Sequence, residues 1–335
     1  MSYCAIVIVG FRCPDDIVGC VSSLREMDGP DHTIHICENG GDTAFAELCA
    51  SLRPLCEADA SAPDLSKRGL ATRVLTLSDG KTRIFVHRAP GNLGYAGGIN
   101  AVLDHLASDP DWDAIWILNP DTAPEPAALK SLKARAAQGS YGVVGSRIVL
   151  THNQRIQMYG GRWRRWIARG WNIGLGEPAS ATPDIAQVEA EMQYVCGASM
   201  YVIRPFIETV GPMEEGYFLY AEEVDWCLRR GSFRLGYAHE SIVHHHHGAT
   251  IGSNHSRKAR SSFSVFLDER SKLLLTRRFY PGIFPLVAVS TLLLTTQYAA
   301  QGAYKNFGVA LAGWFSGLKG DTGFPAKFAP PPARP

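Results

Sequence analysis

The sequence predicts an α/β fold in which helices flank a mostly parallel central sheet, followed by a helical extension. Two observations predict the sheet. In the first half of the chain, short apolar runs rich in β-branched residues alternate with segments of helical periodicity, which is the pattern of strand–helix–strand units. Several of these runs end in glycine or in an acidic residue, and open α/β sheets bind their ligands at such strand ends.

Composition is that of an ordinary globular protein with no general affinity for polyanions. The 335 residues are 46% hydrophobic and 19% charged, with a net charge of +1. Nucleic acid is therefore not an expected partner, and an anionic ligand needs a local site. The eight cysteines form no CxxC pair and are expected to be reduced thiols of a cytosolic protein. No basic segment or cleavage site precedes the first apolar run, so no signal peptide is expected.

Periodicity and β-branched content define the individual elements. Continuous apolar runs are typical of buried parallel strands, and apolar residues that share one helical face indicate helices. Residues 57–70 hold Pro63 among alanine, serine and aspartate and indicate a loop or an insertion. Strands are expected at 3–9, 33–37, 82–87 and 113–118. Helices are expected near 14–27, 43–52 and 125–137, and a further helix is opened by residues 90–100 and runs to about 107.

Three strand ends carry residue types that suit a phosphate or a cation. Glu38 ends the second strand just before a glycine turn. The glycines of Asn92–Asn100 open a helix, where the backbone can approach a phosphate; the alternative is a tight strand-to-helix turn. Asp121 directly follows a buried strand, where it can hold a divalent cation; the alternative is a turn or a helix cap.

The densest group of reactive side chains lies in Phe218–Arg229. Glu222, Glu223 and Asp225 fall within four residues among aromatic side chains. Low dielectric and like charges raise the pKa of such carboxylates toward that of a general base. Pairing with an arginine one helical turn later is the alternative role. The run His244–His247 follows and suggests a metal ligand or a partner of phosphate.

The segment between these motifs is predicted to form an exposed hairpin, a loop and one further strand. Aromatic and basic residues alternate in Gly160–Trp166. We interpret this segment as an exposed hairpin, with stacking on a base, packing on a sugar and contact with a lipid headgroup as alternatives. Residues 176–190 are loop-like, and Tyr194–Ile203 indicates a strand whose small first residues let a ligand come close.

Six short motifs, in this order along the chain, resemble those of the family 2 glycosyltransferases, and most of all the bacterial rhamnosyltransferase-like branch. The resemblance covers roughly residues 3–280, and its most characteristic part is Asn92–Asn100. The motifs are Ile8-Val9-Gly10-Phe11, Glu38-Asn39-Gly40, Asn92-Leu93-Gly94-Tyr95-Ala96-Gly97-Gly98-Ile99-Asn100, Leu118-Asn119-Pro120-Asp121, Cys196-Gly197-Ala198-Ser199 and Phe218-Leu219-Tyr220-Ala221-Glu222-Glu223-Val224-Asp225-Trp226.

The resemblance implies a GT-A fold over residues 1–250, with a mostly parallel, Rossmann-like sheet flanked by helices. Residues 1–150 are then the nucleotide-sugar-binding half, and 151–250 the acceptor-binding, catalytic half. It also implies an inverting transfer of a sugar from a nucleoside diphosphate donor, with magnesium or manganese as the metal. The branch favours L-rhamnose and a dTDP donor, with UDP donors as the alternative. The implied acceptor is a hydroxyl of a glycan, or of a polyprenyl-diphosphate-linked glycan, in cell-surface polysaccharide synthesis.

Residues in these motifs correspond to the ligand-binding residues of the family. Asp121 corresponds to the main carboxylate on the metal, in an Asn-Pro-Asp that replaces the family's Asp-x-Asp. Glu38 corresponds to an acid that is more often aspartate and that binds the nucleoside. The resemblance thereby implies donor-binding roles for Val9, Gly10, Phe11, Glu38, Asn92, Gly97, Gly98, Asn119, Asp121 and Arg229.

The catalytic base of similar enzymes is the second acid of a Glu-Asp pair, which corresponds here to Glu223. The resemblance implies that Glu223 takes the proton of the acceptor hydroxyl, with Glu222 and Asp225 as rivals. Glutamate for aspartate at 223 and asparagine for aspartate at 119 leave an inactive nucleotide-sugar-binding subunit as the alternative. Nucleotidyl transfer needs a basic glycine-rich loop near the N-terminus, and Gly10–Cys13 does not supply one.

A late His-x-x-Gly-x-Ser pattern of the family aligns best with His245, Gly248 and Thr250. The resemblance implies that His245 binds the metal or the diphosphate. Because four histidines follow one another, the register is open by one residue.

Residues 251–335 form the predicted helical extension. No charged residue occurs from Pro281 to Tyr304, which leaves a buried helix, a helix in the membrane interface or a membrane span as interpretations. Basic residues at 270–278 lie on the approach to this segment and suit a polyprenyl-diphosphate acceptor at the cytoplasmic leaflet. We expect a cytoplasmic protein, peripheral at the inner face of the plasma membrane, with homo-oligomers as an open alternative. The Pro-rich tail from 325 to 335 is expected to be disordered.

Overall fold

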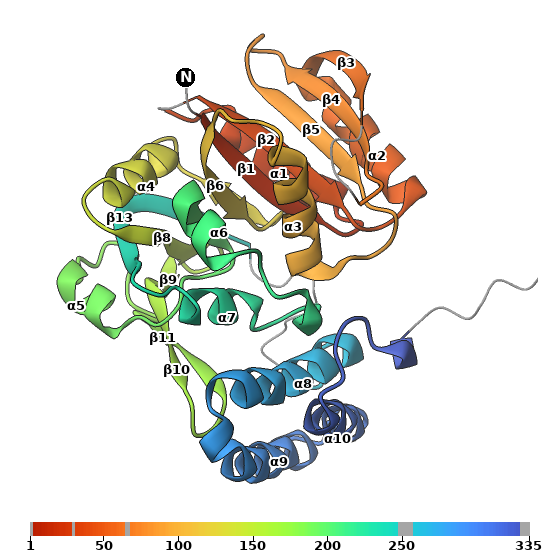
Figure 1. The fold of residues 1–335 in the computed structure, drawn as a ribbon, viewed down its shortest axis with the longest axis vertical. Helices are drawn as coiled ribbons and strands as arrows, with labels where there is room; N and C mark the ends of the chain where they lie inside the picture. Colours follow the sequence, from red (N-terminus) through yellow and green to blue (C-terminus); the bar gives the residue numbers. More distant parts are fainter. Residues whose placement is uncertain (1–2, 29–30, 64–67, 247–256, 329–335) are drawn as a thin grey trace, which may run out of the picture.

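The computed structural model describes residues 3–28, 31–63, 68–246 and 257–328. Within them, an 11-stranded sheet is flanked by helices, and three C-terminal helices pack together at one end of the molecule (Figure 1). The predicted α/β class and the helical extension are therefore both present. Residues 329–335 of the predicted disordered tail lie outside the described part of the chain.

Four parallel strands form the centre of the sheet, in the order β5-β2-β1-β6. Most of their side chains are buried on both faces, which explains the near-continuous apolar runs in the sequence. The strands and helices predicted for this half are confirmed, with ends that shift by a few residues. They are β1 (Tyr3–Gly10), α1 (Pro14–Leu24), β2 (His32–Glu38), α2 (Asp42–Leu52), β5 (Arg83–Arg88), α3 (Gly94–Leu106), β6 (Trp112–Leu118) and α4 (Ala128–Ala136).

Helices α1 and α3 cover opposite faces of this central part. A Cβ atom at Gly98 of α3 would come within 2.8 Å of Val9, whereas one at Gly10 would come within 2.7 Å of Ile17 of α1. Successive residues of a strand face opposite sides of the sheet, so Val9 faces α3 and Gly10 faces α1. The carboxyl end of β1 is thereby enclosed between the two helices.

Two segments predicted as loops contain regular structure. Part of the predicted loop at 57–70 is β3 (Cys56–Ala62), which pairs with β4 (Ala71–Leu77) as an antiparallel hairpin at the sheet edge. The side chains of β3 are exposed or half-buried, so backbone pairing holds the strand and no apolar alternation marks it. The predicted loop at 176–190 contains α5 (Ile185–Glu191), which buries only one side chain and begins at a capping Asp184.

The second half of the chain joins the same sheet and makes it mixed rather than mostly parallel. The strand predicted at 194–203 is shorter, and it runs antiparallel between β6 and β8. A long strand that ends in the histidine run pairs in parallel with β8 and antiparallel with β7. Periodicity reveals a strand but not its direction. These strands are β7 (Thr122–Pro124), β8 (Tyr141–Leu150), β12 (Ser199–Ile203) and β13 (Arg234–His245).

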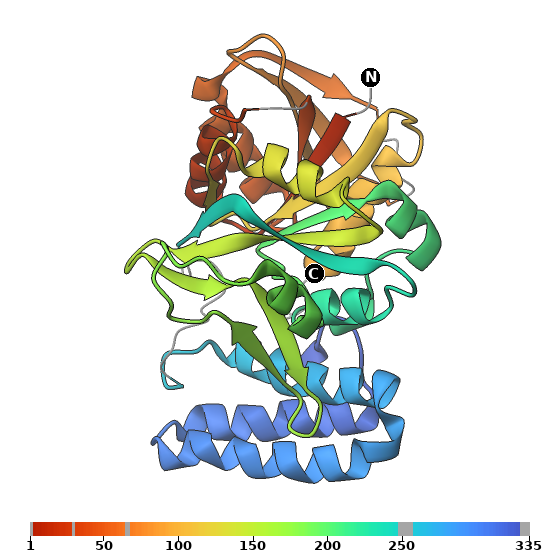
Figure 2. The same ribbon diagram turned by 90° about the vertical axis from the view of Figure 1, so that its left-hand side faces the viewer.

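The hairpin predicted at 160–166 is confirmed as β10 (Gly160–Arg164) and β11 (Arg169–Ile173). It reaches down from the sheet to the C-terminal helices (Figure 2). At its tip, Ser290 Oγ donates a hydrogen bond of 2.8 Å to the Trp166 carbonyl oxygen. The hairpin therefore connects the sheet to the extension.

The extension consists of α8 (Ser262–Phe279), α9 (Phe284–Ala300) and α10 (Tyr304–Lys319). Helix α10 lies close to α8, because a Cβ atom at Gly313 would come within 2.3 Å of the Phe266 carbonyl oxygen. Helix α9 packs on α10, where Trp314 Nε1 donates to the Ala288 carbonyl oxygen at 2.9 Å.

Helix α9 is only partly buried, which contradicts the interpretation as a buried helix. Pro281–Ala300 is long and apolar enough to cross a membrane by length and composition, and 28% of its most apolar window is buried. Leu286, Val289 and Leu293 are 56%, 56% and 64% exposed. These three residues, called here the α9 stripe, share one face of the helix.

Candidate active site

Several segments meet at the carboxyl edge of the parallel strands. They are the ends of β1, β2 and β6, the start of β12, and the first turns of α3 and α7 (Glu222–Leu228). The hydrogen bonds that join them run from Asn39 Nδ2 to Gly94 O (3.1 Å), from Asn119 N to Ala198 O (3.1 Å) and from Tyr95 N to Phe218 O (3.0 Å).

Glu38 ends β2 with its carboxylate buried beside Gly10. Its Oε1 accepts hydrogen bonds from the backbone N–H groups of Arg12 (3.1 Å) and Gly40 (2.6 Å). Its Oε2 is buried and has no hydrogen-bond partner among the described residues, so it is suited to a ligand that donates N–H or O–H. Burial raises the pKa of Glu38, and the two backbone hydrogen bonds oppose this rise. Phe11, close by in sequence, is 45% exposed.

The glycines of the 92–100 segment have packing roles. A Cβ atom at Gly98 would meet Val9, and one at Gly97 would meet the preceding turn at 2.8 Å. Gly94 has a φ of +75°, and a Cβ there would lie 2.4 Å from a backbone carbonyl oxygen. Asn92 is exposed, and its Oδ1 accepts a hydrogen bond from Gly94 N at 3.0 Å. Close packing accounts for these glycines, and their contacts with a donor stay predictions.

Asp121 and His245 lie side by side and offer a carboxylate oxygen and an imidazole nitrogen to one cation. Asp121 Oδ1 is 3.2 Å from His245 Nε2, and His245 Nδ1 is 2.7 Å from Gln157 Oε1. When Nδ1 donates to Gln157, a neutral His245 presents the lone pair of Nε2 beside Asp121. The Asp121 carboxylate suits Mn²⁺ or Mg²⁺, and the His245 imidazole favours Mn²⁺ of the two.

The histidines of the 244–247 run face different surroundings. His244 Nε2 lies 3.1 Å from Glu125 Oε1, and only His245 of the described histidines in the run contacts Asp121 with its side chain. His246 reaches Asp121 through its backbone N–H, at 2.9 Å from the carbonyl oxygen. His247, Gly248 and Thr250 lie outside the described residues.

Tyr95 connects the candidate metal-binding turn to the candidate catalytic acids. Its hydroxyl lies 2.7 Å from the Gly197 carbonyl oxygen and 3.3 Å from Asn119 Oδ1. Burial raises the pKa of Tyr95 well above its usual value, and the charges of Glu222 and Glu223 add to the rise. A Cβ atom at Gly197 would lie 3.7 Å from Glu223 Cγ, which puts Glu223 next to this junction. The sequence gives Tyr95 no role beyond its place in the glycine motif.

The turn before α7 has a strained backbone. Phe218, Tyr220 and Ala221 have φ angles of +66°, +70° and +74°. The left-handed region costs a non-glycine residue about 1–3 kcal/mol. Contacts from elsewhere in the fold must therefore hold residues 217–221, called here the acid turn, in this conformation.

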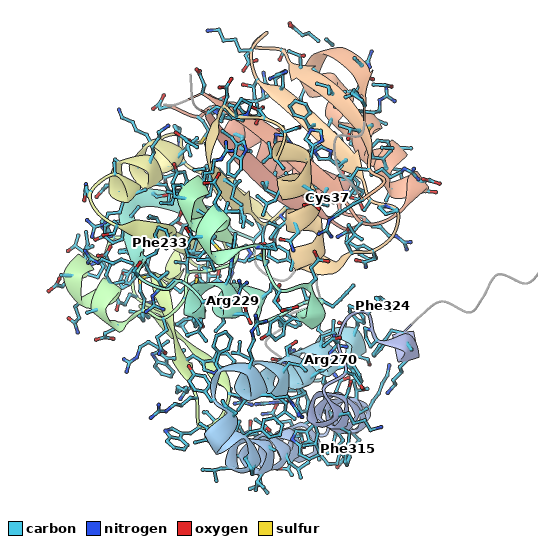
Figure 3. All side chains as sticks on the ribbon, in the orientation of Figure 1. Cys37, Arg229, Phe233, Arg270, Phe315 and Phe324 are labelled. Carbon is cyan, nitrogen blue, oxygen red and sulfur yellow. The ribbon has the colours of Figure 1, made fainter. Side chains whose placement is uncertain are left out.

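Two helices hold the acid turn from different sides. From α8, Arg270 donates to the Tyr217 carbonyl oxygen at 3.0 Å, and Ser271 Oγ donates to that of Leu219 at 3.2 Å. From α3, the backbone N–H of Tyr95 donates to the turn. Figure 3 labels Arg270 on α8, close to the lower end of the sheet domain. The orientation of α7 and its acids thus depends on both helices.

Asp225 belongs to a buried salt-bridge network. Its Oδ1 accepts from Arg229 Nε at 2.6 Å, while Oδ2 lies 3.0 Å from the Tyr217 hydroxyl and 3.2 Å from Arg278. Arg229 also donates to two backbone carbonyl oxygens, at 2.9 and 2.8 Å. The side chains of Asp225 and Arg229 therefore both bind other groups of the protein. The geometry favours a structural role for both Asp225 and Arg229, and the donor-binding role of Arg229 stays a prediction.

Glu222 and Glu223 open α7 in different surroundings. Burial raises the pKa of both, and the charge of Glu223 raises that of Glu222 further. Glu222 Oε2 is buried and has no hydrogen-bond partner within the described part of the chain, so Glu222 is the member of the pair that holds a proton most readily. Glu223 instead lines a cavity of about 540 Å³.

The cavity in front of Glu223 lies between α7, the β10–β11 hairpin and helices α8 and α9. Its size is that of a site for a small organic ligand. Aromatic and charged side chains dominate its walls, and sequence reasoning missed most of them because segments far apart in the sequence supply them. They include Trp163, Arg169, Tyr194, Tyr220, Arg257, Arg260, Asp268, Glu269, Lys272 and Tyr298.

Comparison with known proteins identifies the family to which this fold and site belong. Residues 5–177, just over half of the chain, match the model of Glycosyl transferase family 2. The chain is a member of this family. It is also 22% identical over 206 residues to the low-salt glycan biosynthesis hexosyltransferase Agl10 of Haloferax volcanii, a match that covers 60% of this chain and 63% of that protein.

Two solved structures share the fold. The mannosyltransferase PcManGT of Pyrobaculum calidifontis, in complex with GDP-Man and Mn²⁺, aligns with a TM-score of 0.52 at 10% identity and covers 95% of this chain and 75% of that one. GalNAc-T7 with UDP, GalNAc and Mn²⁺ aligns with a TM-score of 0.53 at 12% identity, over 82% and 51% of the two chains. These similarities confirm the predicted GT-A architecture.

The pairing of Asp121 with His245 predicts which histidine binds the metal. Replacing His245 with alanine removes an imidazole nitrogen 3.2 Å from Asp121 and should weaken Mn²⁺ binding at least about tenfold. His244→Ala is the matched control, because His244 turns toward Glu125 and its loss should leave Mn²⁺ affinity unchanged. Manganese EPR at saturating UDP or dTDP measures both. Weaker binding in His244→Ala alone would place the register one residue earlier.

Proposed function

We propose that the chain is an inverting glycosyltransferase that moves a hexosyl group from a nucleoside diphosphate donor to a hydroxyl of a glycan acceptor. The observation that carries this proposal is the position of Glu223. It faces a cavity, burial raises its pKa, and it adjoins the junction that leads to Asp121 and His245. Family membership and similarity to a hexosyltransferase support the class of reaction.

In the proposed reaction, Glu223 is the general base. The acceptor hydroxyl oxygen attacks the anomeric carbon, and its proton passes to Glu223. The bond between that carbon and the diphosphate oxygen breaks, and its electron pair leaves with the diphosphate. Asp121 and His245 would hold a divalent metal, which when bound would neutralise charge on the leaving group, so that this group would need no proton. Attack from the face opposite the leaving group inverts the anomeric carbon.

Glu38 is the proposed partner of the donor nucleoside. Its buried Oε2 lacks a hydrogen bond within the described residues and can accept one from a base N–H or a ribose hydroxyl. Thymine and uracil carry the same ring N–H, so both dTDP-sugars and UDP-sugars suit this oxygen. The rhamnosyltransferase-like motifs support the narrower proposal of L-rhamnose from a dTDP donor.

The alternative of an inactive nucleotide-sugar-binding subunit rests on Glu223 and Asn119. Glu223 keeps a carboxylate on the cavity wall. Asn119 Oδ1 lies 3.3 Å from the Tyr95 hydroxyl, where an amide oxygen accepts a hydrogen bond without adding a charge to a buried junction. Both departures are therefore compatible with catalysis, and we favour the enzyme.

The acids of α7 predict a contrast between two isosteric variants. Glu223→Gln removes the base and should lower kcat about 10²–10⁴-fold, with donor affinity unchanged. Glu222→Gln reproduces the protonated carboxyl that burial favours at this position and should keep most of the activity. Transfer assays with a panel of nucleotide sugars, combined with calorimetry of donor binding, measure both effects.

The raised pKa of Glu223 also predicts the pH profile. Only the ionised carboxylate accepts a proton, so activity falls as pH drops through this pKa, which lies above that of an ordinary glutamate. The Glu222→Gln variant should show the same acidic limb. If Glu223→Gln turned over the donor as fast as the wild type, Glu223 would not be the base.

We also propose that transfer takes place at the cytoplasmic face of the plasma membrane, on a polyprenyl-diphosphate-linked glycan. The α9 stripe is apolar and exposed. Next to it, Trp166 at the hairpin tip is 49% exposed, and the Arg165 guanidinium lies 5.1 Å from its ring centroid. Apolar, tryptophan and arginine side chains side by side are typical of surfaces at a membrane interface.

The cavity beside Glu223 suits such an acceptor. It lies between the hairpin and helices α8 and α9, and its walls include Arg169 and Arg257. Arginine is well adapted to bind phosphate oxygens. A lipid-linked diphosphate held there would present its glycan to Glu223 while its chain stays near the α9 stripe.

This placement predicts membrane binding through the α9 stripe. Leu286→Gln with Leu293→Gln should weaken binding to phosphatidylglycerol-containing vesicles about tenfold or more, since two exposed leucines no longer bury in lipid. Leu175→Gln is the control, because Leu175 is 62% exposed and lies outside α9. Cosedimentation measures the binding. Equal loss in both variants, or no binding by the wild type, would contradict the proposal.

A further inference from the structure

Three buried histidines meet between the sheet and α3. His35 comes from β2, His87 from β5 and His105 from the last turn of α3. Their exposed fractions are 1%, 0% and 6%. One ring nitrogen of each lies within 4.8 Å of those of the other two. None of the three belongs to the candidate active site, and the proposed reaction gives them no role.

The spacing of the first two rings fits two ligands of one tetrahedral ion. His35 Nδ1 and His87 Nε2 are 3.2 Å apart. Two nitrogens at about 2.0–2.1 Å from a tetrahedral zinc ion lie roughly 3.3 Å from each other. Either a shared N–H or a cation bound to both lone pairs accounts for so short a distance.

The third ring approaches from another direction. The planes of His35 and His87 differ by only 11°. The His105 ring is tilted by 59° to the first and by 60° to the second, with centroids 5.8 and 4.6 Å away. A tetrahedral ion takes its third ligand from outside the plane that contains the ion and the first two nitrogen atoms. His105 belongs to the helix that covers the sheet, so it can supply this third nitrogen.

The outer nitrogens have the partners expected of metal-bound histidines. His35 Nε2 lies 3.0 Å from Thr33 Oγ1, and His87 Nδ1 lies 2.9 Å from Thr72 Oγ1. A metal-bound imidazole usually donates its other N–H to an acceptor that fixes the ring. When both rings donate outward in this way, the facing lone pairs are left for a cation.

We propose that His35, His87 and His105 form a structural site for a transition-metal ion of the zinc type. Imidazole nitrogen suits Zn²⁺, Co²⁺, Ni²⁺ and copper, in contrast to the carboxylate ligand offered by Asp121. The ion ties α3 to β2 and β5. It therefore stabilises the helix that carries the glycine turn, and it takes no part in the transfer.

The metal content of the untagged protein tests this site. After extensive dialysis against EDTA, which removes metal bound at the surface, the wild type should retain about one equivalent of Zn²⁺ by mass spectrometry because the site is buried. His105→Gln should lose it. The control His239→Gln removes a partly buried histidine of β13 and should keep it.

Refolding of the wild type provides a second readout that needs no variant. Protein refolded with ZnCl₂ should melt about 5 °C or more above protein refolded with EDTA, through binding linkage. Co²⁺ should give the visible absorption of a tetrahedral site, and His105→Gln should lack it. The proposal is overturned if the two preparations melt at the same temperature and the dialysed protein retains less than about a tenth of an equivalent of metal. The three histidines would then form only a hydrogen-bonded chain.

Discussion

The strained acid turn is the constraint on which the rest of the site depends. Three of its residues hold left-handed φ angles without being glycine, and such a backbone persists only when its surroundings enforce it. Arg270 is 1% exposed and donates to the carbonyl oxygens of Tyr217 (3.0 Å) and Gly323 (2.7 Å). Burial lowers the pKa of Arg270 to about 10, so it remains a charged donor at neutral pH.

This constraint makes the C-terminal extension part of the site. Helix α8 supplies Arg270 and Ser271 to the turn and also lines the cavity in front of Glu223. Helix α10 packs on α8 where Gly313 and Gly317 leave room for close contact. The same extension carries the α9 stripe. Acceptor binding and membrane contact, as proposed above, therefore use one structural unit that also orients the proposed general base.

The central strands could be predicted from the sequence, because burial on both faces leaves an apolar run. The strand ends could be located because acids and glycines interrupt those runs. The edge strand β3 could not, since its exposed alanine, serine and aspartate side chains leave no pattern. The direction of β12 could not be predicted either, because antiparallel and parallel strands have the same side-chain periodicity. In both segments, backbone hydrogen bonds determine how the strand pairs, and the side chains carry no sign of it.

The candidate site was predictable as a set of residue types but not as a network. The sequence showed three acids in α7 and an arginine one helical turn later as a possible partner. Only the fold shows that Asp225 is the acid that pairs with Arg229 and that Arg278 joins it. Tyr95 joins Asn119 to Gly197, three segments that are distant in sequence. Such a role depends on convergence in space, which no local motif records.

The central claim is that a single carboxylate, Glu223, deprotonates the acceptor while the diphosphate leaves from the opposite face. The anomeric configuration of the first-formed product tests it most directly, by proton NMR during transfer from the nucleotide sugar that the chain accepts. Inversion requires a product whose configuration is opposite to that of the donor. A product that retains the donor's configuration would contradict it.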